Sequence, residues 1–282
     1  MNDLWTLERE ILQEGYTLLC GVDEAGRGPL AGPVCAAAVI LPVGLELPGL
    51  NDSKKLTEKQ REALFIPIKA AAKAYGIAFA SVEEIENLNI LNATFLAMNR
   101  AISQLSSQPD LALNDGNRNT GISFPSRCIV KGDSRCADIA AASVLAKVSR
   151  DHFMLEMAEK YPEYGFERHK GYGTKLHYDA IRKYGPCPIH RASFLRKLHL
   201  WIKKVWDPGA RSRPPATCAF TATASLNATF PAVQEKSILL RKKENSLFLS
   251  KLRQGKMLNL RRPGNSSPMP SSSEFLPLLS CI

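Results

Sequence analysis

Apolar residues in the first part of the chain gather in short runs of the length of β-strands. The segment from Thr17 to Leu41 holds one apolar run, a glycine-rich stretch at Ala25–Pro29, and a second apolar run from Val34. Two such runs around a glycine-rich turn predict two strands joined by a hairpin or tight bend. A further strand is predicted over Tyr75 to Val82.

Three other segments have the spacing of helices. Thr57 stands before Glu58, Lys59 and Gln60 and an apolar series at helical intervals, so a helix is predicted to begin there. A second helix is predicted over Ala93–Leu105. A third, rich in alanine, is predicted over about Ala137–Glu159, because Tyr161 and Pro162 end it.

Two short apolar runs between these helices each lead into an acidic turn. Leu111–Leu113 is followed by Asp115, and Cys128–Val130 is followed by Asp133. Strands that are grouped early and then alternate with helices are typical of a mixed sheet with helices on its faces. The predicted fold class is therefore α/β.

The last part of the chain has a different composition, rich in Pro, Ser, Thr and basic residues. Trp206 to Ile282 holds eleven Lys/Arg and four Asp/Glu, a net charge of +7, whereas residues 1–205 hold 26 and 23, a net of +3. Residues 1–205 are predicted to form one folded domain and residues 206–282 a disordered basic tail. The tail suits a polyanionic partner, while the charge of the main domain is a weak argument for one.

Several common classes of protein are disfavoured. The seven cysteines include no C-x-x-C pair, so buried reduced thiols are expected rather than disulfides or a zinc site. The chain has no apolar run of about 18 residues, and Asp3, Glu8, Arg9 and Glu10 occupy the region where a signal peptide is apolar. A cytoplasmic protein with no membrane partner is expected.

Acidic residues follow three of the predicted strands. They are Asp23 and Glu24 after the first strand, then Asp115 and Asp133. Side chains at the ends of neighbouring strands gather at one edge of a sheet. Carboxylates without histidine or thiolate suit Mg²⁺ or Mn²⁺, and two such ions can activate water for phosphodiester hydrolysis. In the alternative interpretation each acid is a turn residue, and Asp133 before Ser134 caps a helix.

Eight blocks of sequence follow one another between about residues 18 and 195. They are Val22–Pro33, Asn51–Leu56, Leu91–Thr94, Asp115–Asn117, Lys131–Asp133, Ala140–Val148, His169–Thr174 and His190–Phe194. Together these blocks resemble the ribonuclease HII family. The resemblance implies a ribonuclease H-like mixed sheet flanked by helices. It implies a metal-dependent endonuclease that hydrolyses the RNA strand of RNA/DNA hybrids and cuts 5′ of single ribonucleotides in duplex DNA, leaving 3′-hydroxyl and 5′-phosphate ends. Its cellular role would be the removal of such ribonucleotides and of RNA primers during DNA replication and repair.

The resemblance also assigns roles to residues. The implied catalytic ligands of Mn²⁺ or Mg²⁺, in a two-metal mechanism, are Asp23, Glu24, Asp115 and Asp133. The implied contacts to the ribose of the cleaved nucleotide are Gly26, Arg27 and Gly28, whose main-chain groups would reach the 2′-hydroxyl. Glycine suits this position because it lets a backbone approach a sugar closely, and the 2′-hydroxyl separates ribose from deoxyribose.

Further substrate contacts come from lysines and one tyrosine. The resemblance implies that Lys54 contacts a phosphate and that Tyr172 stacks on the sugar of the following nucleotide. Lys55 and Lys147 are weaker phosphate candidates, for which a solvated surface position is the alternative. The remaining histidines of these blocks, His169 and His190, are assigned no role.

Some features leave alternatives open. The related ribonuclease HIII family shares the implied fold, and a catalytically inactive hybrid-binding protein would lack one of the four acids. Asn114 stands where the family usually has an apolar residue, so either the strand end is distorted or the amide faces the site. The tail is a non-specific electrostatic tether, a passive extension, or a weak sliding-clamp contact through Ser246–Leu249. The protein is expected to be a monomer.

Overall fold

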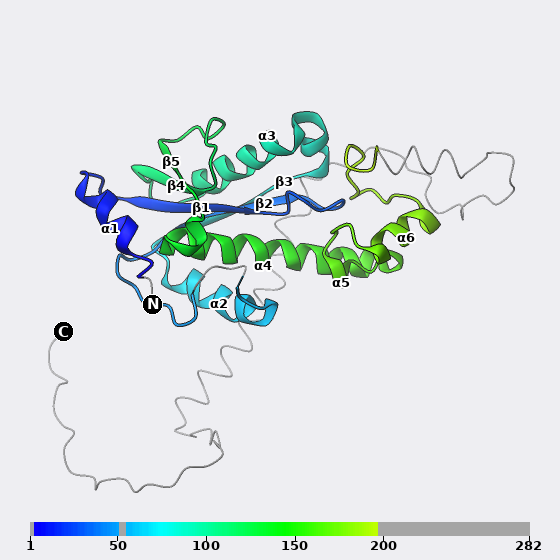
Figure 1. Cartoon of the computed structure of the whole chain (residues 1–282), viewed down its shortest axis with the longest axis horizontal. Helices are drawn as coiled ribbons and strands as arrows, with labels where there is room; N and C mark the ends of the chain where they lie inside the picture. The colour runs from blue at the N-terminus through cyan, green and yellow to red at the C-terminus, as the bar shows by residue number, and fades with distance from the viewer. Residues whose placement is uncertain (1–2, 51–54, 197–282) are drawn as a thin grey trace, which may run out of the picture. The chain divides into compact units, whose positions relative to one another are not determined.

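The computed structural model describes residues 3–50 and 55–196 of the 282-residue chain. These residues contain a five-stranded mixed sheet in the order β3-β2-β1-β4-β5 (Figure 1). The strands are β1 (Leu19–Ala25), β2 (Val34–Ile40), β3 (Ala74–Ala80), β4 (Leu111–Asp115) and β5 (Ser126–Ile129). Strands β1, β2 and β3 pair antiparallel, whereas β4 and β5 run parallel to β1. The predicted α/β class is confirmed.

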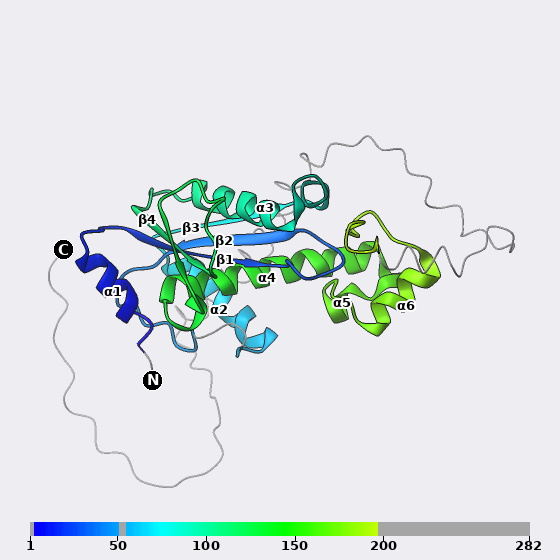
Figure 2. The ribbon, with the colours of Figure 1, turned by 45° about the horizontal axis from the view of Figure 1, so that its top comes forward.

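The helices have the following bounds. They are α1 (Thr6–Gln13), α2 (Glu58–Ala71), α3 (Val82–Ser103), α4 (Ala137–Lys160), α5 (Phe166–His169) and α6 (Lys175–Tyr184), with short 3₁₀ turns η1 (Gly132–Ser134) and η2 (Pro162–Tyr164). Helix α3 covers one face of the sheet and α4 the other, with α2 packed outside α4 (Figures 1 and 2). No helix in these residues is long and apolar enough to cross a membrane.

Strand β2 shows how the two faces are built, because its side chains are buried on both sides. Ala36 and Ala38 belong to the core beneath α3, while Ala37 and Val39 belong to the core beneath α4 and α2. Small residues let α4 approach the sheet closely: a Cβ on Gly21 would lie 2.1 Å from the carbonyl carbon of Asp138. The alanine-rich composition of α4 therefore reflects close packing against β1.

Two of the predicted helix starts can be compared with the structure. Helix α2 begins as predicted, with a capping box between Thr57 and Gln60. The start predicted for α3, Ala93, is wrong, because a second capping box at Ser81 and Glu84 starts the helix at Val82. Asn89 has a positive φ of 68° inside this helix, and that break separates the first turns from the rest.

The cysteines of the described part are free, as expected. Cys20, Cys35, Cys136 and Cys187 are buried, and Cys128 is half-buried. Burial raises the pKa of the Cys20 and Cys35 thiols, which keeps them neutral. The boundary predicted near residue 205 and the tail that follows it lie outside the described residues.

Candidate active site

The sheet brings the acids of β1 and β4 to the same edge. These strands are parallel neighbours with Val22 opposite Asn114, so Asp23 and Asp115 are the next residues along the two strands. Asp23 is 4% exposed, and Glu24 and Asp115 are half-buried. All three line one cleft, as the strand ends predicted.

Asp23 is the most buried acid of this cleft. Burial, followed by the negative charge of Glu24, raises the pKa of Asp23 to about 7. The ammonium of Lys147 and the hydroxyl of Ser143, both on α4, act in the opposite direction. The Lys147 Nζ atom lies 3.8 Å from the Asp23 Oδ2 atom and donates a hydrogen bond to Ser143. Lys147 is therefore part of the cleft and not a solvated surface residue.

Asp133 lies in the 3₁₀ turn η1, whose first residue contacts Asp115, and it is the one predicted ligand that is not among the residues lining the cleft. The main-chain N–H of Gly132 donates to the Asp115 Oδ1 atom at 2.7 Å, and Asp133 is 1% exposed. Helix α4 begins three residues later, with Cys136 as its N-cap. The interpretation of Asp133 as a helix cap is therefore wrong.

The chemistry of these donors fits a hard divalent cation. They are carboxylates without histidine or thiolate, and burial with a neighbouring carboxylate disfavours the ionised form of Asp23, a penalty that a cation relieves. In residues 3–50 and 55–196, no three of the His, Cys, Asp and Glu side chains form a group that could hold one metal ion. The strand ends thus supply donor types that suit a hard divalent cation.

Asn114 leaves the strand regular, contrary to one of the two expectations for it. It pairs with Val22 and Cys128 in the sheet and is fully buried. The side-chain amide donates to the carbonyl oxygen of Arg118 at 3.2 Å, on the opposite face of the sheet from Asp23. The amide therefore does not face the carboxylates.

A glycine turn directly after β1 forms a second side of the cleft. Gly26 has a φ of +93°, and a Cβ there would lie 2.1 Å from the Arg150 Nε atom, so only glycine fits. A Cβ on Gly28 would lie 3.7 Å from the ring of Tyr172. The structure therefore places the predicted ribose contacts and the predicted stacking residue side by side. Arg27 is exposed and pairs with Glu24 at 3.1 Å.

Three buried histidines support the loop of Gly171 and Tyr172, which we call the tyrosine loop. His177 Nδ1 lies 2.9 Å from the carbonyl oxygen of Tyr172, so this nitrogen carries the proton and donates. His177 Nε2 then accepts from His190 Nε2 at 3.0 Å. His169 Nδ1 accepts from the N–H of Gly171 at 3.2 Å. Burial lowers the pKa of His177 and of His190 to about 4, which leaves this pair neutral near pH 7.

Two buried arginines to which the sequence assigned no role bind the backbone of the segment after β1, and one of them also binds Lys170, beside the tyrosine loop. Arg150 donates to the carbonyl oxygens of Ala31, Pro33 and Lys170, at 3.0–3.2 Å. Arg191 donates to those of Gly26, Arg27 and Gly32, at 2.6–3.0 Å. No local pattern marks these arginines, because their acceptors lie far away in the sequence.

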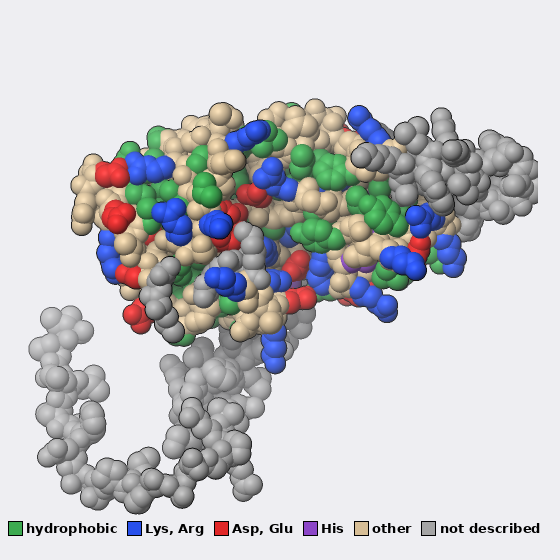
Figure 3. Space-filling view, viewed as in Figure 1, with side chains coloured by type: hydrophobic (Ala, Val, Ile, Leu, Met, Phe, Trp, Pro, Cys, Tyr) green, Lys and Arg blue, Asp and Glu red, His purple; other side chains and the backbone are tan. Residues whose placement is uncertain are grey.

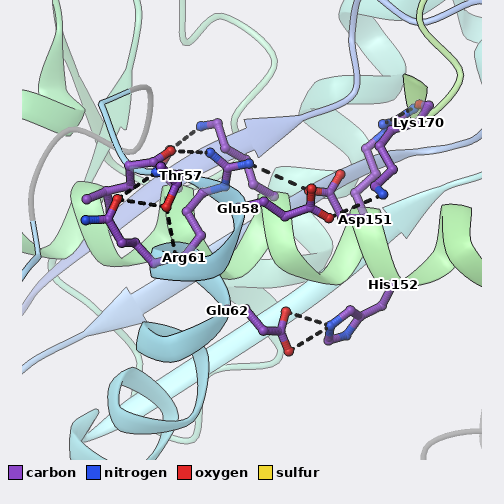
Figure 4. A network of polar contacts seen from close by, with 12 residues as sticks. Thr57, Glu58, Arg61, Glu62, Asp151, His152 and Lys170 are labelled. Atoms are coloured by element: carbon purple, nitrogen blue, oxygen red, sulfur yellow. Dashed lines mark hydrogen bonds and ion pairs between the residues drawn. The ribbon is translucent and has the colours of Figure 1, made fainter. Parts of the chain in front are cut away.

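A network of ion pairs borders the cleft (Figure 4). Arg61 of α2 lies 3.9 Å from Asp151 of α4, and Lys170 lies 3.3 Å from Glu58. All four residues line the cleft, so they connect α2, α4 and the segment that leads to Tyr172. Of the predicted lysines, Lys55 is exposed and Lys54 lies outside the described residues.

Charges of both signs are mixed on the face of the molecule in Figure 3. Basic and acidic side chains alternate there with hydrophobic ones, which agrees with the small net charge of residues 1–205. On this face the domain therefore presents no uniformly basic surface to a polyanion.

Comparisons with known proteins place the chain in a family. The family model of ribonuclease HII matches residues 20–197. The Ribonuclease HII of Endomicrobium trichonymphae is 55% identical over 194 residues, which cover 68% of this chain and 92% of that protein. The Ribonuclease HII of Caldicellulosiruptor bescii is 53% identical over 197 residues, which cover 70% of this chain and 96% of that protein.

Solved structures share the fold. The crystal structure of ribonuclease H2 from Pyrococcus horikoshii OT3 matches with a TM-score of 0.56 and 25% identity, over 67% of this chain and 100% of that one. A complex of PCNA with RNase HII from Archaeoglobus fulgidus matches with a TM-score of 0.51 and 22% identity, over 62% of this chain and 94% of that one. Bst-RNase HIII in complex with Mn²⁺ matches with a TM-score of 0.51 and 17% identity, over 66% of this chain and 70% of that one. At this identity the match shows a shared fold alone. The chain therefore belongs to the ribonuclease HII family and is an endoribonuclease of the ribonuclease H type.

Proposed function

We propose that this cleft cuts nucleic acid strands on the 5′ side of a ribonucleotide, both in RNA/DNA hybrids and at single ribonucleotides in duplex DNA. Membership of the family supports activity on hybrids. One observation carries the finer proposal: the carboxylates of β1 and β4 line the same cleft as Gly26 and Tyr172. Groups suited to phosphodiester chemistry thus lie beside groups suited to reading a sugar.

In this proposal Asp23, Glu24, Asp115 and Asp133 hold Mg²⁺ or Mn²⁺. The bound ions would supply an activated water and stabilise the leaving oxygen. The chain's own contribution is to keep the carboxylates at the sheet edge, with the Gly132 N–H orienting Asp115 and the Lys147 ammonium beside Asp23. The neighbour solved with Mn²⁺ shares only the fold, so the donor chemistry of the cleft is the main support for a divalent ion.

Recognition of the ribose is assigned to the glycine turn and the tyrosine. Gly26, Arg27 and Gly28 present main-chain groups, two of them on exposed residues, and a 2′-hydroxyl both donates and accepts hydrogen bonds. Tyr172 is 51% exposed, so its ring is accessible to the next sugar. Lys147 in the cleft, and Lys54 by its sequence position, are assigned to phosphate contacts, with exposed Lys55 as a weaker candidate.

The nucleophile in this proposal is water and not the neighbouring 2′-hydroxyl. The products therefore carry 3′-hydroxyl and 5′-phosphate ends. A 2′,3′-cyclic phosphate among the products would mean that the 2′-hydroxyl attacks, and the proposal would be wrong.

The test is a cleavage assay on two duplexes, one with a single ribonucleotide and one with a long RNA strand, each with and without Mg²⁺ or Mn²⁺. We expect both to be cut, only with a metal, and the first on the 5′ side of the ribonucleotide. Cleavage of the long hybrid alone would remove the part of the proposal that concerns single ribonucleotides. Full cleavage in the presence of a chelator would show that the reaction needs no metal ion, and that part of the proposal would be wrong.

The wider role and the partners follow from this activity. An enzyme with these products would remove ribonucleotides and RNA primers from DNA, working as a monomer in the cytoplasm. The neighbour solved with PCNA is consistent with a weak clamp contact, for which Ser246–Leu249 is the candidate segment, outside the described residues. Gel filtration of the chain with and without a sliding clamp tests both the monomer and the contact.

A further inference from the structure

Two peptide groups of the glycine turn are held by one buried cation. The Arg191 guanidinium donates to the carbonyl oxygen of Gly26 at 2.6 Å and to that of Arg27 at 3.0 Å. A third hydrogen bond, to Gly32 at 2.9 Å, anchors the same guanidinium across the loop. Arg191 is fully buried, so these contacts are made away from solvent.

The geometry of a trans peptide fixes where the other ends of these groups point. The carbonyl of Gly26 shares its peptide plane with the N–H of Arg27, and the carbonyl of Arg27 shares its plane with the N–H of Gly28, with C=O and N–H on opposite sides. Because Arg191 occupies the buried side, both N–H groups point away from it. Arg27 and Gly28 are exposed, and Gly28 faces the ring of Tyr172.

The two N–H groups are available to a ligand. Among residues 3–50 and 55–196, no acceptor receives a hydrogen bond from the main-chain N–H of Arg27 or of Gly28. Within the same residues Arg191 forms no ion pair, and its side-chain hydrogen bonds all end on carbonyl oxygens, while Arg150 and Glu86 act on its charge without a hydrogen bond. Burial lowers the pKa of Arg191 to about 9, and the guanidinium is still cationic near pH 7.

We propose that Arg191 is a positioning residue for ribose recognition: it orients the peptide groups of Gly26–Gly28 and strengthens the N–H groups of Arg27 and Gly28 as donors to the 2′-oxygen. A hydrogen bond from a cation polarises a peptide group, and a polarised peptide donates more strongly at its other end. Deoxyribose has no oxygen at this position, so the gain is confined to a ribonucleotide. This inference rests on the proposed function.

Arg150 is the natural comparator in the same protein. It is as deeply buried as Arg191 and also donates to three carbonyl oxygens, but those belong to Ala31, Pro33 and Lys170. Loss of either guanidinium should loosen the loops, because Arg150 packs against Gly26 and lies over the Tyr172 ring, whereas Arg191 alone hydrogen-bonds the two carbonyl oxygens of the glycine turn. The two variants therefore separate polarisation from general loosening.

The measurement is a discrimination ratio in the metal-loaded full chain. It is the Ki of an all-DNA duplex, measured as a competitor, divided by the KM of a duplex that differs by one 2′-hydroxyl. Arg191→Lys keeps the charge and Arg191→Gln keeps donors without charge. We expect the ratio to fall about 3-fold for Lys and about 10-fold for Gln, with the Ki for all-DNA unchanged, because charge-assisted hydrogen bonds are the stronger ones.

Two outcomes overturn the inference. Equal losses for Arg191→Lys and Arg191→Gln would mean that the charge has no effect. A loss for Arg150→Gln as large as that for Arg191→Gln would mean that loosening of the loops explains the result. Thermal unfolding of each variant establishes that the comparison is made between folded proteins.

The wild-type protein provides a test that needs no variant to fold. In ¹⁵N spectra, a duplex with one ribonucleotide should shift the amide resonances of Arg27 and Gly28, and the all-DNA duplex should not. Identical shifts with both duplexes would overturn the inference. If the wild-type protein cuts neither substrate, the proposed function itself fails, whereas cutting with unchanged discrimination in the variants rejects only the role of Arg191.

Discussion

The two sides of the cleft are built in different ways. On one side Asp23, Glu24 and Asp115 continue two adjacent parallel strands, and the register of the sheet alone brings them together. On the other side Arg191 holds the glycine turn through a contact that spans 164 residues, whereas Tyr172 is held by His177, five residues further along the chain. The first side follows from strand order, whereas the second depends on buried side chains that never face the substrate.

The two sides also differ in how their charged groups are stabilised. The sheet edge brings negative charges together, and their repulsion destabilises the metal-free fold and is relieved by a bound cation. The loop side gathers buried positive charges that are satisfied by carbonyl oxygens, so it favours a fixed backbone. Substitutions on the two sides should therefore act on different quantities.

The largest effect is expected at the sheet edge. Asp23→Asn or Asp115→Asn should lower cleavage by about 1,000-fold or more, because an amide cannot replace an anionic ligand. The unfolding temperature of the metal-free Asp23→Asn protein should stay the same or rise, since burial disfavours the carboxylate. Asp179→Asn, a surface acid paired with Arg182, is the matched control and should leave the activity unchanged. Full activity of an edge variant without metal would contradict the assignment.

A smaller effect, confined to one substrate, is expected on the loop side. Tyr172→Ala should weaken cleavage at a single ribonucleotide roughly 10- to 100-fold, the range for loss of one stacking contact. The long hybrid should suffer less, and the unfolding temperature should barely change because the ring is half exposed. Tyr184→Ala removes another exposed ring outside the cleft and serves as the control. Equal losses on both substrates would show that Tyr172 does not read the junction.

The cost of buried carboxylates can be measured away from the cleft. Glu8 and Asp138 are buried together, and the Asp138 N–H donates to the Glu8 carboxylate at 3.2 Å. Burial raises the pKa of both carboxyls. A carboxyl group whose pKa is higher in the folded than in the unfolded protein stabilises the fold when it is protonated. This contribution is complete below the pKa of the unfolded state, about 4, and is lost as the pH rises through the pKa of the folded state.

Glu8→Gln should therefore be more stable than the wild type near neutral pH, and the difference should shrink in acid. We expect the unfolding temperature to rise by about 2–4 °C at about pH 8, the shift that corresponds to roughly 1 kcal/mol in a domain of this size. Differential scanning calorimetry from about pH 5 to pH 8 measures it. Glu10→Gln, an exposed residue of the same helix, should change little. A destabilised Glu8→Gln protein would mean that the carboxylate is satisfied in the fold.

The smallest effect concerns the tail, where only the sequence guides the expectation. A chain truncated after Lys204 should have a KM raised about 2- to 5-fold at low salt and equal to that of the full chain at high salt, with kcat unchanged, because counterion release fades as salt rises. Identical kinetics at every salt concentration would leave the tail passive. Loss of folding would place the domain boundary further along the chain.

Local sequence was sufficient for a large part of the fold. The hairpin of β1 and β2, the start of α2 and the length of α4 follow from apolar spacing, a capping box and a proline. The start predicted for α3 at Ala93 is too late, although the capping box of Ser81 and Glu84 is a local signal that marks the true start. Asn114 is different, since no local pattern tells which face of the sheet a strand residue meets.

From the sequence alone we could predict the carboxylates at the strand ends, the glycine turn and, through resemblance, the family. Each of these depends on residues that are close together in the chain, where spacing is informative. Three-dimensional packing was needed to show that Arg150 and Arg191 support the loops, and that Gly132, beside Asp133, contacts Asp115 while Cys136 is the N-cap of α4. These contacts join segments up to 165 residues apart, and such pairs arise from packing of α4 and the last turns against the sheet, which no short pattern encodes.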